Sequence, residues 1–468
     1  MSVILTFAAV IPFLPIVSFF VYGAFALAAA RRERHAPAGG VAVTGADDLF
    51  FVFVVPCLNE ELVIGPSLDR LLGFANRAMA VVVIDDGSDD ATARIVRGYA
   101  ERDPRVRLLQ RRPPEARKGK GAALNAAYRY LRSSGLVAAT GRDIDRVIVV
   151  VVDADGRLQP DTLTVVAPLF ADRRTAAVQI GVRMYNRGAG WLARMQDMEF
   201  LVFTEIFQRA RHRYGNAGLG GNGQFVRLGA LDSLGAEPWT DYLTEDLDMG
   251  LRLQSRGWRT SFTPHTYVDQ EGLTSLRPLM RQRTRWYQGH LQCWSRLADV
   301  LACRELSVGR TVDLVVYLVS PITVLLITLS LVAYLPRQIY VLATQWQAAV
   351  DAALAHHGLL LWWYLVVLAV IPLIAVIYWR ASNRAGPDVS LPRALLYSAL
   401  FTAYAYVWLP VGWRATWRLL RGRRGWTKTL RLGQPAATDA GRPVLPAPRA
   451  ATDDPRPGVP ESPYVTRS

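Results

Sequence analysis

Three apolar runs, each ending in a polar cluster, constrain the fold of this chain more strongly than any other feature. The runs cover residues 51–55, 80–84 and 147–152, are rich in valine, and alternate with stretches of helical periodicity. Continuous β-branched runs between helices are typical of a parallel sheet that helices cover on both faces. We therefore predict an α/β fold for the middle of the chain.

The polar clusters occupy the carboxyl ends of these predicted strands, where open α/β sheets bind ligands. They contain Asn59 and Glu60 after the first run, Asp85 and Asp86 after the second, and Asp153 and Asp155 after the third. Residues i and i+2 after a strand point the same way, so Asp153 and Asp155 can bind one hard cation, although two loop acids would give the same pattern. The sequence has no Walker A motif and no G-x-G-x-x-G after the first strand, which disfavours a P-loop kinase and an NAD enzyme.

Two later segments also carry groups that suit a phosphorylated substrate. Lys120 lies in a basic turn with glycines and can place an ammonium on a phosphate, or it can simply face solvent. Glu245 and Asp246 follow Thr244 at the start of a predicted helix. Acids in a first helical turn suit the helix dipole, but a carboxylate there can also act as a general base toward an acceptor hydroxyl. The residues alone leave both alternatives open.

The segment 281–286 joins the α/β region to long apolar runs. As a helix it would place Gln282, Arg285, Trp286 and Gly289 on one face. Arginine binds phosphate in a bidentate manner and aromatic rings stack on sugars, so this face suits a sugar phosphate. An arginine-rich amphipathic helix with tryptophan is also typical of a helix that lies on a membrane.

The chain has 468 residues, is 51% hydrophobic and has a net charge of +15, and its apolar residues gather towards both ends. Four runs approach or reach the length that crosses a bilayer: residues 3–30, 312–334, 358–378 and 391–411. Basic residues flank these runs, which favours membrane lipid as a partner and disfavours nucleic acid. The arginines at 31–34 predict that the following domain is cytoplasmic.

The charge after the last apolar run conflicts with this topology. Four spans that start outside would leave the C-terminus outside, whereas residues 414–424 are strongly basic and indicate the cytoplasm. Either one run does not span fully or an extra short segment inserts. The run 391–411, with Pro410 near its end, is the weakest span.

We predict seven consecutive segments. They are an N-terminal transmembrane helix (1–30), a linker (31–48), a catalytic α/β domain (49–270), interfacial helices (271–310), about three transmembrane helices (311–413), a basic juxtamembrane segment (414–433) and a disordered tail (434–468). Cys57, Cys293 and Cys303 lack the spacing of a zinc site, so we expect reduced thiols. The whole is expected to be an integral, multi-pass protein of the cell membrane.

The order of the motifs resembles that of membrane-embedded family 2 glycosyltransferases, the group that contains cellulose, hyaluronan, chitin-oligosaccharide and poly-N-acetylglucosamine synthases. Five segments occur in the family's order: residues 56–60, 85–88, 153–155, 244–246 and 282–286. The loop 221–224 is similar to the family's acceptor-side loop but departs from the F-x-C-G-[ST] form of cellulose synthases. The resemblance covers about residues 51–289.

This resemblance implies a GT-A (Rossmann-like) fold and inversion at the anomeric carbon of a nucleotide sugar, with UDP-glucose or UDP-N-acetylglucosamine as the favoured donor and Mg²⁺ or Mn²⁺ as the cofactor. It implies these roles: Asp246 as the catalytic base; Asn59, Glu60, Asp85, Asp86, Lys120 and Asp153 at the nucleotide donor; Asp153 and Asp155 at the metal; and Glu245, Gln282, Arg285, Trp286, Gly221 and Asn222 at the acceptor and diphosphate. We expect the neighbouring Arg281 and Arg283 to contact lipid headgroups or solvent.

Two functions within the family follow from the resemblance. The first is a processive synthase that extends a β-linked polysaccharide and exports it through its own helices, with accessory export subunits as further partners. The alternative is a non-processive enzyme that adds one sugar to a lipid or a short acceptor, since some lipid glucosyltransferases carry a related Q/R-x-x-R-W motif. From a different class, a membrane transporter with a nucleotide-sensing domain would keep its transport activity after loss of Asp246.

Overall fold

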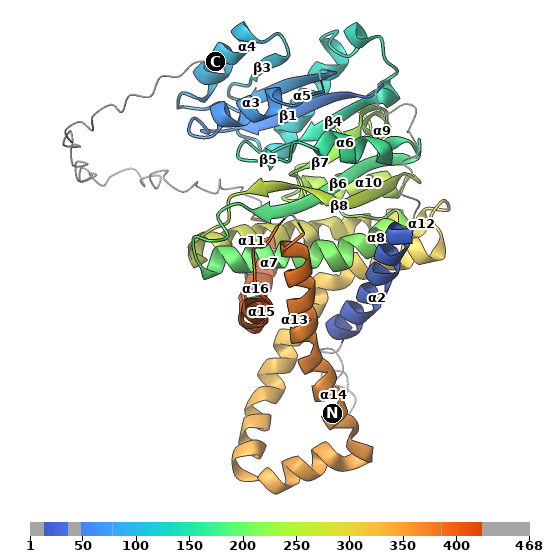
Figure 1. Ribbon diagram of the computed structural model, residues 1–468, viewed down its shortest axis with the longest axis vertical. Helices are drawn as coiled ribbons and strands as arrows, with labels where there is room; N and C mark the ends of the chain where they lie inside the picture. Colours follow the sequence, from blue (N-terminus) through green and yellow to red (C-terminus); the bar gives the residue numbers. More distant parts are fainter. Residues whose placement is uncertain (1–13, 36–47, 77, 385, 424–468) are drawn as a thin grey trace, which may run out of the picture. The chain divides into compact units, whose positions relative to one another are not determined.

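The computed structural model describes residues 14–35, 48–76, 78–384 and 386–423. Its centre is an eight-stranded sheet with the strand order β3-β2-β1-β4-β7-β6-β8-β5 (Figure 1). The strands are β1 Phe50–Cys57, β2 Met79–Asp85, β3 Val106–Gln110, β4 Val147–Val151, β5 Arg157–Leu158, β6 Thr175–Met184, β7 Gln224–Arg227 and β8 Arg259–Gln270.

The first half of the sheet is parallel, as predicted, but the second half is mixed. β1 pairs in parallel with β2 and β4, and β2 pairs in parallel with β3. β7 runs antiparallel to both of its neighbours, β4 and β6, while β6 and β8 are parallel to each other. The three strands predicted from the apolar runs, β1, β2 and β4, are thus parallel as expected. The antiparallel strands are β7 and β5, which pairs with β8, and neither of them was predicted from the sequence. Both strands are short, with four and two residues, so their sequences carry little information on direction.

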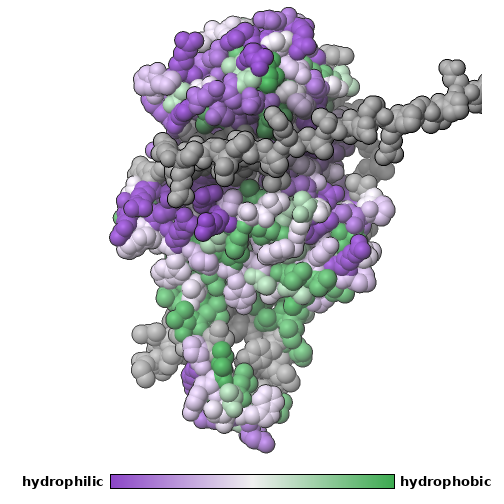
Figure 2. Space-filling model, turned by 90° about the vertical axis from the view of Figure 1, so that its left-hand side faces the viewer, coloured by the Kyte–Doolittle hydropathy of each residue, from purple (hydrophilic) through white to green (hydrophobic). Residues whose placement is uncertain are grey.

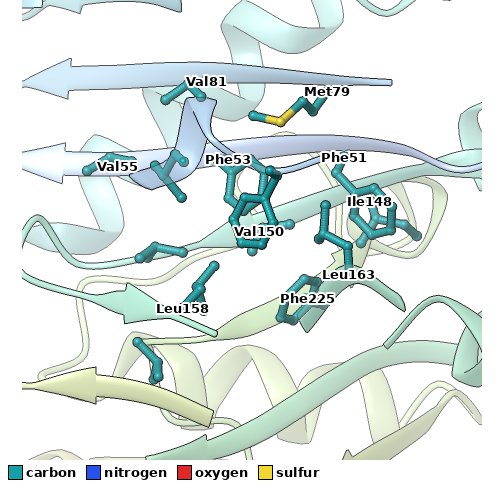
Figure 3. Close-up of a cluster of buried hydrophobic side chains, with 14 of the residues drawn as sticks. Phe51, Phe53, Val55, Met79, Val81, Ile148, Val150, Leu158, Leu163 and Phe225 are labelled. Atoms are coloured by element: carbon teal, nitrogen blue, oxygen red, sulfur yellow. The ribbon is translucent and has the colours of Figure 1, made fainter. Parts of the chain in front are cut away.

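Both faces of β1 are buried, which explains why the strand is apolar at successive positions. Phe51 and Phe53 point into one core, and Val52 and Val54 point into the other. Figure 3 shows the first core, in which Phe225 lies near Phe51 and the two rings meet edge to face at 6.4 Å. Burial of side chains of this size contributes about 1.5–3 kcal/mol each.

Helices cover the two faces of the sheet. The first core is closed by α3 Ile64–Leu72, α4 Thr92–Arg102 and α6 Thr162–Val166. The second is closed by α5 Lys120–Ser133, α9 Leu228–Asp232 and α10 Glu245–Gln254.

A layer of helices lies against the β6 and β8 side of the domain. α7 (Trp191–Phe203) continues through a π-helical turn (Thr204–Gln208) into α8 (Arg209–Tyr214). α11 (Leu276–Gln292) and α12 (Leu297–Ala302) occupy the region predicted to be interfacial.

Long apolar helices complete the described chain. They are α2 Leu14–His35, α13 Val308–Thr344, α14 Trp346–Ser382, α15 Leu391–Ala405 and α16 Trp408–Leu420. Within the described residues, three segments are long and apolar enough to cross a membrane: Val308–Val332, Leu365–Ser382 and Leu391–Leu420. Figure 2 shows hydrophobic residues gathered on the part of the surface that these helices form, and mostly hydrophilic residues over the α/β domain.

Two details differ from the expected segments. The run expected to span at 391–411 is interrupted after Ala405 and resumes as a separate helix at Trp408. α2 continues through His35, so the first residues of the expected linker are helical. The start of the first expected span, most of the linker, the end of the basic segment and the tail lie outside the described residues.

Candidate active site

The start of α10 is held against α11 by a close approach at Gly289. A Cβ built on Gly289 would lie 2.6 Å from Thr244 Oγ1 and 2.7 Å from the Thr244 main-chain nitrogen. A second contact joins the same two segments, because Leu243 N donates a hydrogen bond to Gln292 Oε1 at 3.0 Å. The position of Glu245 and Asp246 therefore depends on α11, a helix that lies some forty residues further along the sequence.

Lys120 connects four segments that are distant in the sequence. Its Nζ donates to Asp153 Oδ1 at 2.5 Å and to the carbonyl of Gly221 at 2.8 Å. A Cβ on Gly221 would lie 3.0 Å from Asp246 Oδ2 and 3.5 Å from Lys120 Nζ. Lys120, Asp153, Gly221 and Asp246 thus converge, as the motif order led us to expect, and the glycine leaves room for the side chains of Lys120 and Asp246.

The loop that contains Gly221 and Asn222 is held by Gln179, which the sequence analysis did not single out. Gln179 is 2% exposed; it accepts a hydrogen bond from Gly220 N at 2.9 Å and donates to the carbonyl of Asn222 at 2.9 Å. Asn222 in turn accepts from Asp153 N at 3.1 Å and donates to Gln270 at 3.0 Å. The only signal of Gln179 in the sequence is a polar residue inside the apolar strand β6.

Asp153 and Asp155 fit the expected role of a divalent cation site. Asp155 is 6% exposed, and its Oδ2 accepts from Glu271 N at 3.2 Å, whereas the side chain of Asp153 is 35% exposed. Among the described residues, no group of three or more His, Cys, Asp or Glu side chains could hold a metal by itself. Mg²⁺ commonly takes one or two carboxylates together with substrate phosphates, so this oxygen donor set fits such an ion with a bound diphosphate.

A separate cluster forms at the ends of β1 and β2. Asn59, with a positive φ of 54°, accepts from Asp89 N at 2.8 Å, and its own N–H donates to Ser88 Oγ at 2.9 Å. Asp85 Oδ1 accepts from Ser88 N at 3.0 Å. These contacts bring the first two motifs together at the sheet edge, as predicted.

The remaining two donor-side carboxylates are largely buried. Asp86 accepts from Arg111 Nη1 at 2.5 Å, and the Arg111 side chain is 7% exposed. Burial raises the pKa of Asp86, and the charges of Arg111 and Arg117 oppose this. Glu60 is 5% exposed, and its N–H donates to Thr92 Oγ1 at 2.8 Å. Arg111 had no motif to mark it in the sequence.

The helix α11 presents Gln282, Arg285 and Trp286 as half-buried side chains, consistent with one face. Trp286 meets Phe200 of α7 edge to face at 5.9 Å. Arg285 lies near enough to Glu245 and Asp153 to interact with their charges, although burial lowers the pKa of Arg285.

The expectation for Arg283 is wrong, whereas Arg281 is exposed as expected. The Arg283 side chain is 1% exposed, and its Nη2 donates to Glu199 Oε2 at 2.6 Å. Its guanidinium also lies 4.1 Å from the centre of the Trp286 ring and donates to Gln282 Oε1 at 2.7 Å. Helical position alone did not reveal this, because the acid that pairs with Arg283 comes from α7.

The carboxylates at the start of α10 have a strong tendency to hold a proton. Burial raises the pKa of Glu245 to about 7, and the charge of Asp246 adds to the effect. Burial also raises the pKa of Asp246, although Leu247 N donates to its Oδ1 at 2.9 Å and Lys120 opposes the shift. Burial lowers the pKa of Lys120, but the charges of Asp153, Glu245 and Asp246 outweigh burial and raise it. A buried acid pair beside a fixed cation is suited to proton transfer near neutral pH.

The solved structure of a mannosyltransferase from Pyrobaculum calidifontis, in complex with GDP-Man and Mn²⁺, has the same fold. It aligns over 85% of this chain and 98% of its own, with a TM-score of 0.51 and 19% sequence identity. The α/β domain is therefore a GT-A, Rossmann-like domain.

Two curated relatives are Beta-monoglucosyldiacylglycerol synthases. The one from Trichormus variabilis is 31% identical over 275 residues, which are 58% of this chain and 55% of the relative. The one from Synechocystis sp. is 32% identical over 285 residues, which are 58% of this chain and 56% of the relative. The chain thus spans about half the length of these relatives. The model of the family described as "Glycosyltransferase like family 2" matches residues 48–289, which contain the converging side chains described above, and the chain belongs to this family.

Proposed function

We propose that this protein is an inverting, metal-dependent hexosyltransferase that moves one glucosyl unit from UDP-glucose to a hydroxyl of a membrane lipid. The observation that carries the proposal is the convergence of Lys120, Asp153, Asp246 and Arg285 beside a helix that packs on apolar helices. The named activity of the two curated relatives supports a lipid acceptor, and so favours the alternative function over the polysaccharide synthase.

On the donor side, the cluster at the ends of β1 and β2 is assigned to the nucleoside. Asn59, Glu60, Asp85 and Asp86 supply carboxylates and an amide that can accept hydrogen bonds from a base N–H or from ribose hydroxyls. Lys120 is assigned to the diphosphate, because its charge is held at the site by three carboxylates.

Asp153 and Asp155 would hold Mg²⁺ or Mn²⁺. When bound, such an ion neutralises charge that develops on the leaving diphosphate. Arg285 supplies a permanent positive charge for the same purpose, because a guanidinium does not lose its proton in proteins.

On the acceptor side, Asp246 is the proposed base. Its carboxylate takes the proton of the acceptor hydroxyl, and the oxygen attacks the anomeric carbon as the bond to the diphosphate oxygen breaks. The electron pair leaves with the diphosphate, and the configuration at the anomeric carbon inverts. Glu245 keeps the proton affinity of the pair high, and Gly221 and Asn222 shape the loop above Lys120.

The position of α11 supports a lipid acceptor. Gln282 and Trp286 are assigned to the acceptor sugar or headgroup, since the residue that follows Trp286 packs on an apolar helix. Tyr287 Oη donates to the carbonyl of Pro321 in α13 at 2.5 Å. A hydroxyl of a lipid in the membrane surface could reach this helix without leaving the bilayer. We propose accordingly that the protein is a multi-pass membrane protein with its catalytic domain in the cytoplasm.

The experiment is transfer from labelled UDP-glucose in membranes that contain the full chain, with the products sized in both the organic-solvent extract and the residue that it leaves. One discrete glycolipid is expected, and a ladder of increasing size would overturn single addition in favour of polymer synthesis. Asp246→Asn should lower the transfer rate by about 10²–10⁴, the usual contribution of a general base.

Two comparisons keep the test specific. Asp241→Asn changes an exposed carboxylate five residues earlier and should leave transfer unchanged. Near-normal transfer by Asp246→Asn would remove Asp246 from the role of base. An Asp155→Ala enzyme with unchanged activity and metal dependence would remove Asp155 from the metal site.

A further inference from the structure

The helices α15 and α16 carry a surface that the proposed reaction does not use. We propose that these two helices lie in the membrane surface on the side of the catalytic domain, rather than crossing the bilayer, and that the exposed face of α16 binds anionic phospholipid headgroups. This inference concerns the membrane and does not depend on which sugar or acceptor the enzyme uses.

Both ends of the α13–α14 pair lie on the catalytic domain. At the start of α13, Arg310 Nε donates to Asn216 Oδ1 at 3.0 Å, and its Nη2 donates to the carbonyl of Trp258 at 2.8 Å. Just after α14, Arg384 Nη1 donates to Glu205 Oε1 at 2.9 Å. Each helix has 37 residues, which corresponds to about 55 Å at 1.5 Å per residue. The pair is therefore long enough to cross the bilayer and return, and the chain that follows α14 is again on the catalytic side.

α15 starts and ends at the same helix of the catalytic domain, α7. Asp388, just before α15, accepts from Arg194 Nη1 at 3.3 Å, and Tyr397 lies 5.6 Å from the same guanidinium. In the last turn of α15, Tyr404 Oη donates to Glu199 Oε2 at 2.7 Å, and Glu199 lies five residues after Arg194 on α7. A helix of 15 residues is about 22 Å long, shorter than the ~30 Å hydrocarbon core. α15 therefore does not carry the chain to the opposite side.

One face of α16 is bound to the active-site helix α11. A Cβ on Gly412 would lie 3.0 Å from the Tyr287 ring, so the two helices approach closely there. Arg418 Nε donates to Gln288 Oε1 at 3.0 Å, and Gln288 Nε2 donates to the carbonyl of Arg423 at 2.6 Å. Gln288 is fully buried and lies two residues after Trp286.

The opposite face of α16 is exposed and combines tryptophan with arginine. Trp413 is 41%, Trp417 is 56% and Leu420 is 77% exposed. Arg414 and Arg421 are exposed on the same helix and just after it, and Arg421 lies 4.2 Å from the centre of the Trp417 ring. Tryptophan and arginine on one exposed face are typical of a helix in the membrane surface, where the ring sits at headgroup level and the guanidinium meets phosphate.

The charge of this segment identifies the lipid class. Residues 391–423 contain five arginines and no acidic residue. Each arginine near an anionic membrane surface contributes about 1 kcal/mol of attraction, and zwitterionic lipid provides none of it. Placing the basic residues 414–423 on the catalytic side also removes the conflict between their charge and a four-span topology.

The binding test uses the full chain in detergent, titrated with phosphatidylglycerol or phosphatidylcholine and followed by native mass spectrometry. We expect tighter binding of phosphatidylglycerol, and about thirtyfold weaker binding of it by Arg414→Gln/Arg421→Gln. The matched control, Arg97→Gln/Arg129→Gln, removes two exposed arginines of the catalytic domain and should bind like the wild type. Equal binding of the two lipids, or equal loss in the control, would overturn the anionic-lipid site.

The topology test uses an epitope appended after Ser468 in vesicles that expose the catalytic domain. Protease should remove the epitope, because α15 and α16 leave the chain on that side. A matched marker, Gln347→Cys near the start of α14, should be inaccessible to an impermeant maleimide in the same vesicles. A protected epitope would show that α15 and α16 cross the membrane and would overturn the proposal.

Discussion

Replacement of Gly289 by alanine should damage activity far more than stability. The added Cβ would meet Thr244 at 2.6 Å from Oγ1, 2.7 Å from Cγ2 and 2.7 Å from the main-chain nitrogen. Normal carbon contacts lie at about 3.5–4.0 Å, so α11 and the start of α10 must separate by roughly 1 Å. One of the three contacts is with the main chain, so a change of side-chain rotamer cannot relieve it.

The expected magnitudes follow from that displacement. Overpacking costs about 1–3 kcal/mol, and the better helix propensity of alanine over glycine returns about 1 kcal/mol. The net loss of stability is therefore about 0–2 kcal/mol. A displacement of ~1 Å between catalytic groups costs about 100-fold in rate, and this movement shifts Asp246 relative to Arg285.

The assay compares kcat for sugar transfer with thermal unfolding in the same membrane mimetic. Gly98→Ala is the control, because Gly98 lies in α4 and a Cβ there would have no atom within 4 Å. It should raise stability slightly and leave kcat unchanged. Adding Thr244→Ala to Gly289→Ala removes two of the three contacts and should restore part of the rate. Wild-type kcat in Gly289→Ala, or a loss that matches the unfolded fraction, would refute the reasoning.

Three further predictions address the charges and the loop around the site. Activity should fall at acidic pH, because burial raises the pKa of Asp246 and the base takes up a proton at a higher pH than an ordinary aspartate. Glu245→Gln removes the negative neighbour of Asp246 and should move the acidic limb of the pH–rate profile to lower pH, and an upward shift would contradict this. Glu199→Gln leaves the charge of buried Arg283 without its carboxylate and should cost about 3–5 kcal/mol of stability in chemical or thermal unfolding. The double variant Glu199→Gln/Arg283→Met should recover most of this stability, and no recovery would rule out the unpaired charge as the cause. Gln179→Leu removes three hydrogen bonds to the glycine-rich loop and should cost about 1–3 kcal/mol of stability with a larger relative loss of kcat. An unchanged kcat would separate the loop from catalysis.

The residues that were predictable from sequence share a local signature. β1 reads as a continuous apolar run, which is typical of a strand buried on both faces, so the strand was recognisable without a partner. The acids follow each strand directly in the chain, and parallel strands bring their carboxyl ends to one edge. Lys120 and Asp246 lie at helix starts instead, and only the resemblance to family 2 glycosyltransferases assigned them to one site with Asp153 before the structure placed them together.

The features that were not predictable depend on partners far away in the sequence. β7 lies between β4 and β6 and is antiparallel to both, and nothing in its four residues encodes that direction. Gln179 and Arg111 look like ordinary polar residues until the loop and the carboxylate that they bind are folded against them.

By itself, the sequence determined the α/β fold, the position of the acids at the sheet edge and the apolar character of the C-terminal helices, because hydrophobic periodicity and strand ends are local properties. Only the tertiary structure decided that Arg283 is buried against Glu199, that Gly289 sets the position of Asp246, and that the last apolar run is divided into two helices held by α7 and α11. The physical reason is the same in each case. Each property depends on a partner from a distant part of the chain. Arg283 is stable in the interior because Glu199 pairs with it, and residue 289 must be a glycine because Thr244 lies against it. The helices α15 and α16 stay at the surface because α7 and α11 hold them.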